Sequence, residues 1–235
     1  SAGENPCSTG ANEYSVTLIG QDAPLAACCV LGDCIGDLDP TECASFGGTY
    51  VSGETCKSYT CPGGYEPCST GYGEDPLLPE DTGWTAGTSD AGSGYARAMN
   101  VSAPSMSSVA VHGLSLVYNA GWTDCSADAS NMVMGWTLYD DAAGLPGNEL
   151  ANGQGGTHAA LDLVYASAYP LSRWDLPVNY DLSAPWIQIN SSSSGQGECW
   201  FLWMSSTASG AGSSALNDGA GWVAETFNLN YCITP

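Results

Sequence analysis

Eleven cysteines are the residues of this chain with the clearest capacity for chemistry, and six of them lie within residues 27–61. Clustered cysteines either bind zinc as thiolates or form disulfides. Zinc is disfavoured because Cys28 and Cys29 are adjacent, no C-x-x-C pair occurs and no histidine is near. We therefore expect disulfides and an oxidising compartment. Since eleven is odd, one of these cysteines is expected to be unpaired or joined to another chain: Cys7, Cys28, Cys29, Cys34, Cys43, Cys56, Cys61, Cys68, Cys125, Cys199 and Cys232.

Acidic side chains offer a second chemistry, the binding of calcium. Calcium takes six to eight oxygen ligands, and clustered aspartates supply them. The candidate ligands are Asp33, Asp37, Asp140 and Asp141. No EF-hand loop is present, and Asp39 and Glu42, close to the first two candidates, are equally explained as helix-capping residues. Calcium is the one cofactor that the sequence leaves open.

Catalytic patterns are missing from the sequence. A serine hydrolase needs a serine beside a base, but the chain has no G-x-S-x-G, and His112 and His158 are placed in a predicted strand and a glycine-rich turn. A glycosidase needs only two carboxylates, and acids are too numerous here for their presence to discriminate. We therefore predict that the protein is not an enzyme.

Eight tryptophans and twelve tyrosines suggest a third chemistry, the stacking of sugars on aromatic faces. Trp136 and Trp174 alternate with polar residues and are expected in a core. Trp84, Trp122 and Trp186 lie near predicted turns and are the better candidates for an exposed platform.

The charge balance excludes some partners. The chain has 3 Lys+Arg against 25 Asp+Glu, a formal charge of −22, and its basic residues are Lys57, Arg97 and Arg173. Such a surface repels phosphates, so we expect no nucleic acid partner. No apolar run reaches the roughly 20 residues of a membrane span. Solubility, cation binding, a saline or acidic habitat, and resistance to proteases that cut after Lys and Arg all remain explanations of this charge.

The elements that must position these residues fall into four segments. Residues 1–26 hold a predicted strand at 13–20, with Tyr14, Val16 and Leu18 on one face, which either belongs to the chain's own sheet or is donated to a neighbouring subunit. The chain begins with Ser1 rather than Met, as expected after removal of a signal peptide or at the boundary of an expressed fragment.

Residues 27–68 form a cysteine-rich module that is too small to fold by apolar burial alone, so its disulfides must replace a core. Asp39 and Pro40 predict the start of a short helix that ends at Gly47-Gly48, and a tight hairpin is expected around Gly53. Residues 69–79 are rich in Gly and Pro and are interpreted as a linker.

Residues 80–235 predict an all-β domain, a jelly-roll-like β-sandwich of seven or eight short strands. A change of phase at His112-Gly113 indicates a β-bulge, Pro177 suits an edge strand, and "CWFLWM" is expected to be a central strand covered on both faces. The residues expected to face the core are Met132, Met134, Trp136, Leu138, Trp174, Leu176, Val178, Tyr180, Leu182, Phe227, Leu229, Tyr231 and Ile233.

Two stretches carry a resemblance. The pattern CC-x4-C-x8-C-x12-C-x4-C from Cys28 to Cys61, with "GGTY" inside it, resembles a module of secreted and cell-surface proteins of environmental bacteria. "TLYDDAAGLPGNEL", residues 137–150, resembles a strand-and-turn motif of β-sandwich domains in similar proteins, with a turn at residues 145–148. The resemblance implies an extracellular or cell-surface location. Asn100 and Asn190 are candidate glycosylation sites in that setting.

These observations favour a structural role. We predict a secreted subunit of an extracellular, pilus-like filament or surface layer, whose partners are other copies of itself, joined by donation of the N-terminal strand or by the odd cysteine. The alternative is a carbohydrate-binding or adhesion module on the cell surface, with glycans as partners.

Overall fold

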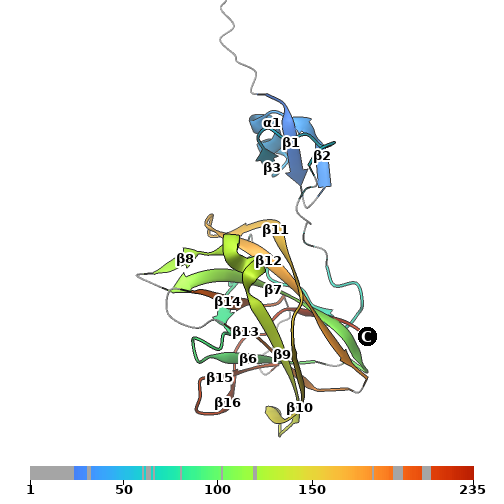
Figure 1. The fold of residues 1–235 in the computed structure, drawn as a ribbon, viewed down its shortest axis with the longest axis vertical. Helices are drawn as coiled ribbons and strands as arrows, with labels where there is room; N and C mark the ends of the chain where they lie inside the picture. Colours follow the sequence, from blue (N-terminus) through green and yellow to red (C-terminus); the bar gives the residue numbers. More distant parts are fainter. Residues whose placement is uncertain are drawn as a thin grey trace, which may run out of the picture.

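The computed structural model describes residues 24–235, apart from 31–32, 60, 62–64, 66, 80, 102, 119–120, 182, 193–197 and 208–212. The predicted donor strand with Tyr14, Val16 and Leu18, and also Cys7 and Leu182, lie outside the described residues. Figure 1 shows a small module, in blue, followed by a larger β domain.

The module is a three-stranded antiparallel sheet with one short helix. The strand order is β2 (Asp33–Leu38), β1 (Ala26–Val30) and β3 (Thr49–Val51), and the helix is α1 (Pro40–Ser45). The expected helix start is confirmed, because the Asp39 carboxylate accepts hydrogen bonds from the backbone N–H groups of Thr41 and Glu42 at 2.8 Å. The predicted hairpin around Gly53 is wrong, since β3 pairs with β1 and the chain after it continues in turns.

Three disulfides hold this module together, as expected of a unit without a core of its own. Cys28 bonds Cys43, Cys29 bonds Cys61 and Cys34 bonds Cys56. Side chains of adjacent strand residues point to opposite faces. The neighbours Cys28 and Cys29, both fully buried, therefore fasten β1 to α1 on one side and to the chain at Cys61 on the other.

The larger domain consists of two antiparallel sheets. One has the order β10 (Pro146–Gln154), β9 (Val133–Asp141), β13 (Trp186–Ser192), β6 (Ala96–Asn100), β15 (Ser214–Asn217) and β16 (Trp222–Ala224). The other has the order β11 (Thr157–Tyr165), β12 (Tyr169–Tyr180), β7 (Met106–Tyr118), β14 (Cys199–Met204) and β5 (Ala86–Thr88); β8 (Trp122–Asp124) and β17 (Tyr231–Thr234) also pair with β7, and β4 (Gly73–Glu74) pairs with β17. A 3-10 helix, η1 (Ser126–Asn131), follows β8.

Successive strands cross from one sheet to the other over much of the chain. The sequence β5, β6, β7 and the sequence β12, β13, β14, β15 each alternate between the sheets. This winding is that of a jelly-roll-like sandwich, and the predicted all-β fold class is confirmed. The stretch expected to be a linker, residues 69–79, contributes β4 to the sandwich, and the Cys68–Cys232 disulfide joins it to β17.

The core between the sheets contains the residues that the alternation predicts. Met134, Trp136 and Leu138 from one sheet pack with Trp174, Leu176 and Val178 from the other, and Leu229, Tyr231 and Ile233 complete the same cluster. Met132, Tyr180 and Phe227 are partly buried against it. The inward faces of β9, β12 and β17 are therefore confirmed for the described residues.

The sheet that contains β12, β7 and β14 is the larger of the two. A second apolar cluster lies on its outer face and includes Leu114, Leu116, Leu202, Met204 and Tyr165. Strand β14 is thus covered on both faces, as predicted, because Phe201 and Trp203 face the first cluster.

The β-bulge predicted at His112-Gly113 is wrong, and the second apolar cluster explains why the sequence suggested it. The pairing of β7 with β12 runs in unbroken register from Leu114 to Ser108, so no bulge interrupts it at His112-Gly113. Val111 faces the inner cluster and Leu114 faces the outer one. The apolar residues therefore switch from one face of β7 to the other without a bulge, and in the sequence this switch looks like a change of phase.

Pro177 lies in β12, which is not an edge strand over most of its length. Strand β12 lies between β11 and β7, but the pairing with β11 extends only to the Thr157–Asp175 pair. Pro177 lies beyond that point and pairs on its other side with Ser108 of β7. Its missing N–H is therefore tolerated where the strand has a local free edge.

Candidate functional site

Three of the four predicted calcium ligands, Asp37, Asp140 and Asp141, accept hydrogen bonds within the fold, and the side chain of Asp33 lies outside the described part of the chain. Asp37 accepts the backbone N–H of Cys56 at 2.7 Å, and Asp33 begins β2 in the same module. Asp140 accepts the backbone N–H and side-chain amide of Asn148 at 2.5 and 2.9 Å. In the part of the chain that the structure describes, Asp37, Asp140 and Asp141 belong to no group of three clustered metal-ligating side chains.

Asp141 stabilises the connection between β9 and β10 through its hydrogen bonds. It accepts the indole N–H of Trp186 at 2.9 Å and the N–H of Gly144 at 3.2 Å, and the Trp186 hydrogen bond is the main cause of its lowered pKa. The turn lies at residues 142–145 and not at the expected 145–148, because Ala143 and Gly144 adopt positive φ and Pro146 begins β10.

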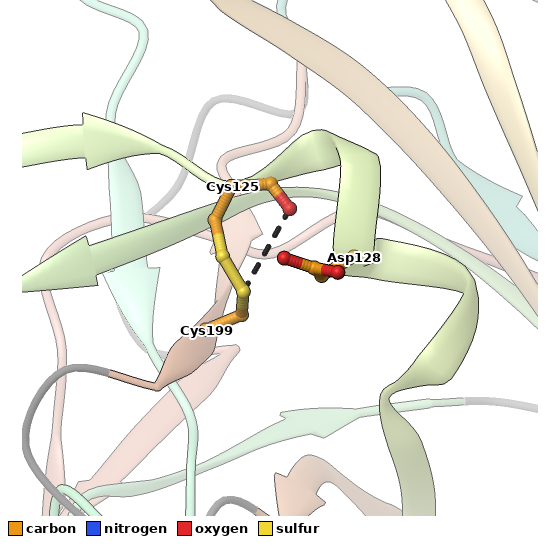
Figure 2. A group of neighbouring side chains, drawn as sticks. All are labelled: Cys125, Asp128 and Cys199. Atoms are coloured by element: carbon orange, nitrogen blue, oxygen red, sulfur yellow. Dashed lines mark hydrogen bonds between the residues drawn. A yellow bond between two sulfur atoms is a disulfide. The ribbon is translucent and has the colours of Figure 1, made fainter.

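A group of three potential metal ligands does occur elsewhere in the described chain. The side chains of Cys125, Asp128 and Cys199 lie within 4.8 Å of one another, and Figure 2 shows them with the two sulfurs joined. Metals bind cysteine as thiolate, which a disulfide sulfur is not. In the disulfide form this group therefore does not supply a thiolate site.

The Cys125–Cys199 disulfide borders a cavity of about 540 Å³. The cavity lies at the end of the sandwich where η1 follows β8. Polar groups on its wall come from Asp128 and Asn131 of η1, Ser192 at the end of β13, and Glu198 next to the disulfide. The cavity thus combines carboxylate, amide and hydroxyl groups.

Three aromatic side chains, of which two are exposed and Trp200 is partly buried, form a cluster at the same end of the molecule, here called the aromatic cluster: Tyr118, Trp122 and Trp200. The Tyr118 ring is parallel to that of Trp200, with centroids 5.9 Å apart, and Trp122 meets Tyr118 at 5.0 Å and Trp200 at 6.0 Å. Tyr118 is 49 % exposed and Trp122 is 39 % exposed. Such contacts stabilise the cluster while leaving aromatic faces open to solvent.

The strand register places the aromatic cluster and the cavity on opposite faces of the same strands. Tyr118 pairs with Trp122, and Trp200 pairs with Leu116 of the outer apolar cluster. The neighbouring pair, Val117 with Cys199, points to the other side and lines the cavity. Strands β7, β8 and β14, close together in Figure 1, position both features.

The three predicted platform tryptophans have different locations. Trp122 is exposed in the aromatic cluster. Trp84 is partly buried, edge-on to Tyr165 at 5.0 Å. Trp186 is fully buried, because Tyr139, Leu145 and Trp222 pack around it, so its assignment to a platform is wrong.

Sequence reasoning missed the two partners of Trp122. Trp200 belongs to the apolar run of β14, where nothing distinguishes it from the buried residues that follow. Tyr118 ends β7, just where the apolar alternation stops, and this end position was the available signal.

Neither histidine is arranged as a catalytic base. His112 is buried against Asn230, and burial lowers its pKa to about 4. The Nε2 atom of His158 lies 3.0 Å from the Ser172 hydroxyl, and burial also lowers the pKa of His158. Ser172 is only 1 % exposed, and no carboxylate in the described chain hydrogen-bonds to either ring. The His158–Ser172 pair therefore lacks both access for a substrate and an acid partner.

The candidate glycosylation sites lie in strands. Asn100 ends β6 and Asn190 lies within β13, and both are partly buried. An acceptor asparagine normally lies in a surface loop, so neither position has the usual setting.

Comparisons with protein-family models, with curated proteins and with solved structures find no match to this chain. What the structure itself indicates about location comes from its five disulfides, which are typical of a non-cytoplasmic compartment. No helix in the described part of the chain has the length and apolarity needed to cross a membrane.

Proposed function

We propose that the protein is an extracellular carbohydrate-binding domain with a role in adhesion, and that the aromatic cluster contacts the sugar. The observation that carries this proposal is the exposure of Tyr118 and Trp122 beside Trp200. A sugar ring has apolar C–H faces that pack on aromatic rings, while its hydroxyl groups need polar partners. Exposed aromatic groups of this kind on a soluble domain are typical of interaction sites.

The charge of the protein supports a neutral ligand. At a net charge of −22, an anionic polymer would be repelled at long range. A neutral glycan meets no such repulsion, and acidic side chains are good acceptors for its hydroxyl protons. Asp128 and Glu198, in the cavity behind the aromatic cluster, are acceptors of this type.

Binding of the labelled full chain to an array of neutral glycans tests the proposal. Trp122→Ala and Tyr118→Ala are each expected to weaken the strongest signals about tenfold, equivalent to about 1.4 kcal/mol of binding free energy. Tyr72→Ala is the matched control, because Tyr72 is also exposed but lies elsewhere on the sandwich. Signals that persist in both aromatic variants would contradict the proposed role of the cluster.

A second candidate function, the self-assembling subunit of a filament or surface layer, is favoured by the pairing of the cysteines. Ten of the eleven cysteines bond one another within the chain, so no cysteine partner in the same chain is left for Cys7. A disulfide at Cys7 would therefore join two chains. In this candidate, a donated strand at residues 13–20 would pair with an exposed sheet edge of the neighbouring copy.

Electron microscopy and non-reducing electrophoresis of the native material test this candidate. A covalent assembly should dissociate into monomers with reductant and should not form in a Cys7→Ser variant. An assembly that resists both changes but is lost on deletion of residues 1–20 would instead support strand donation. Dispersed monomers in the unmodified protein would rule out self-assembly.

A further inference from the structure

The smaller sheet is the one that contains β9, β13, β6 and β15. A row of residues crosses its outer face, which is the face turned away from the larger sheet. Asn190 of β13 pairs with Gly135 of β9, and Asn217 of β15 pairs with Ala96 of β6. The register of β13 with β6, in which Gln188 pairs with Ala98, brings Asn190 level with Ala96. Asn190, Ala96 and Asn217 thus lie side by side on adjacent strands and are here called the amide row.

The residues between and beside the two asparagines are small, so the asparagine side chains protrude from the face of the sheet. Ala96 separates the asparagines, and Gly135 adjoins Asn190 on the other side, where even a Cβ would approach the Asn190 side-chain oxygen to 3.1 Å. Strands in a sheet are spaced about 4.8 Å apart, so the two amides are separated by roughly 10 Å across Ala96. That separation is about the length of two sugar units.

The amides have unused hydrogen-bonding groups. The Asn217 side-chain oxygen accepts the N–H groups of Gly219 and Gly221 at 2.8 and 3.4 Å, which fixes the side chain and leaves its NH2 group without a partner among the described residues. The Asn190 side chain has no partner in the same described set. A partly buried amide without a protein partner has a strong preference for a polar ligand or water.

A loop encloses one side of the row. A cavity of about 280 Å³ is lined there by Asp90, Tyr95 and both asparagines, and Tyr95 is 45 % exposed. Asp90 is fully buried and holds the loop in place, because it accepts the N–H of Gly92 at 2.8 Å and the hydroxyl of Ser191. An aromatic ring, two amides and a small-residue floor therefore meet at one cavity.

We propose that the amide row with Tyr95 is a second sugar-binding site, specific for a neutral glycan. Asparagine amides both donate to and accept from hydroxyl groups, which suits a ligand with many hydroxyls. The described residues that line the cavity include no cation, which does not favour an anionic ligand, and their one carboxylate, Asp90, is engaged by Gly92 and Ser191, which does not favour a metal ion. Asn190, a candidate glycosylation site by sequence, is in this interpretation a ligand contact.

This second site shares a ligand class with the proposed function but does not depend on the aromatic cluster. The aromatic cluster lies on the outer face of the larger sheet, and the amide row lies on the outer face of the smaller one. One molecule with sites on opposite faces bridges two glycans, and linked sites bind a surface more tightly than either site alone.

The neutral-glycan array described above, probed with the full chain, separates the two sites. Asn190→Ala and Asn217→Asp remove amide donors, and the second keeps the acceptor oxygen that holds residues 217–221 in their turn. Both are expected to weaken a subset of neutral-glycan signals at least tenfold. Asn152→Ala is the control, because Asn152 is an exposed asparagine on β10 of the same sheet.

The outcomes distinguish the two proposals. Signals that fall in the Asn190 and Asn217 variants and not in Trp122→Ala support the second site whatever happens at the aromatic cluster. Signals that fall only in Trp122→Ala overturn the second site and leave the proposed function standing. An array on which no neutral glycan binds overturns both. Solution NMR gives an independent measure, because the side-chain NH2 signals of Asn190 and Asn217 should shift when the bound glycan is added.

Discussion

The ring Nδ1 of His112 lies 3.1 Å from the side-chain oxygen of Asn230, at the place where two strands meet the same side of β7. The same oxygen accepts the backbone N–H of His112 at 2.7 Å, and the Asn230 amide donates to the carbonyl groups of His112 and Met204 at 2.8 Å. One fully buried asparagine thus joins β7, β14 and the start of β17. This side chain substitutes for ladder hydrogen bonds where β14 ends and β17 begins.

Replacing Asn230 with alanine should be strongly destabilising. The N–H and C=O of His112 would lose their partner inside the protein, and each buried unsatisfied group costs roughly 1–3 kcal/mol. We expect the free energy of unfolding in urea to fall by about 3 kcal/mol or more. Asn152→Ala, at an exposed position, should change it by less than about 0.5 kcal/mol. A similar small change at Asn230 would show that the bonds of Asn230 carry little stability.

The buried histidine predicts a dependence of stability on pH. Burial lowers the pKa of His112 to about 4 from an ordinary value of 6.5. The unfolded chain therefore takes up a proton below about pH 6.5 that the folded chain does not accept until about pH 4. The contribution of His112 to stability is complete above pH 6.5 and is lost as the pH falls towards 4, by an amount on the order of 3 kcal/mol.

Comparison with a His112→Gln variant isolates this contribution from that of the carboxyl groups. Glu225 acts in the opposite sense, because burial raises its pKa and a group of that kind favours the folded state more as the pH falls. The difference in unfolding free energy between the natural protein and His112→Gln should therefore shrink from pH 7 to pH 4. A difference that is constant over this range would contradict the assignment of a neutral, buried His112.

Local signals in the sequence were sufficient for much of the fold. Alternation along β9, β12 and β17 identified their inner faces because one face of each strand meets the same core. Asp39 and Pro40 located α1 because helix capping depends only on neighbouring residues.

The failures concern contacts between residues far apart in the chain. Trp186 is near a turn in sequence, but Leu145 and Trp222, distant from it along the chain, cover it. The apparent bulge in β7 arose because a separate segment covers the outer face from Leu114 onward. The candidate sites follow the same rule. Tyr118, Trp122 and Trp200 come from three strands, and the amide row comes from three others, so neither group leaves a pattern in any single stretch.

Gly113 provides a direct test of the revised description of β7. A Cβ at this position would lie 2.3 Å from the Phe201 ring and 2.6 Å from the backbone oxygen of Leu202. Gly113→Ala should therefore force β7 and β14 apart and lower the free energy of unfolding by roughly 1–3 kcal/mol, as overpacking of a core does. Gly121→Ala is the matched control, because nothing lies within 4 Å of its Cβ position. Equal stabilities of the two variants in thermal unfolding would contradict the close packing of β7 on β14.

The five disulfides should contribute unequally to stability. Cys68–Cys232 closes a separation of 164 residues, whereas Cys125–Cys199 closes 74. In the chain-entropy description, the longer loop restricts the unfolded chain more, with stabilisation of roughly 5 kcal/mol for the first and roughly 4 kcal/mol for the second. The first bond also fixes β17 against β4, because Cys232 pairs with Gly73.

Replacing Cys68 and Cys232 by alanine should therefore lower the urea midpoint more than the same change at Cys125 and Cys199. Glycan binding should differ in the opposite order, since only the second pair borders the cavity behind the aromatic cluster. Binding and unfolding measured on the same two double variants separate these effects. If the Cys68–Cys232 variant proved the more stable of the two, loop entropy would not be the dominant contribution, and local packing around each bond would have to account for the difference.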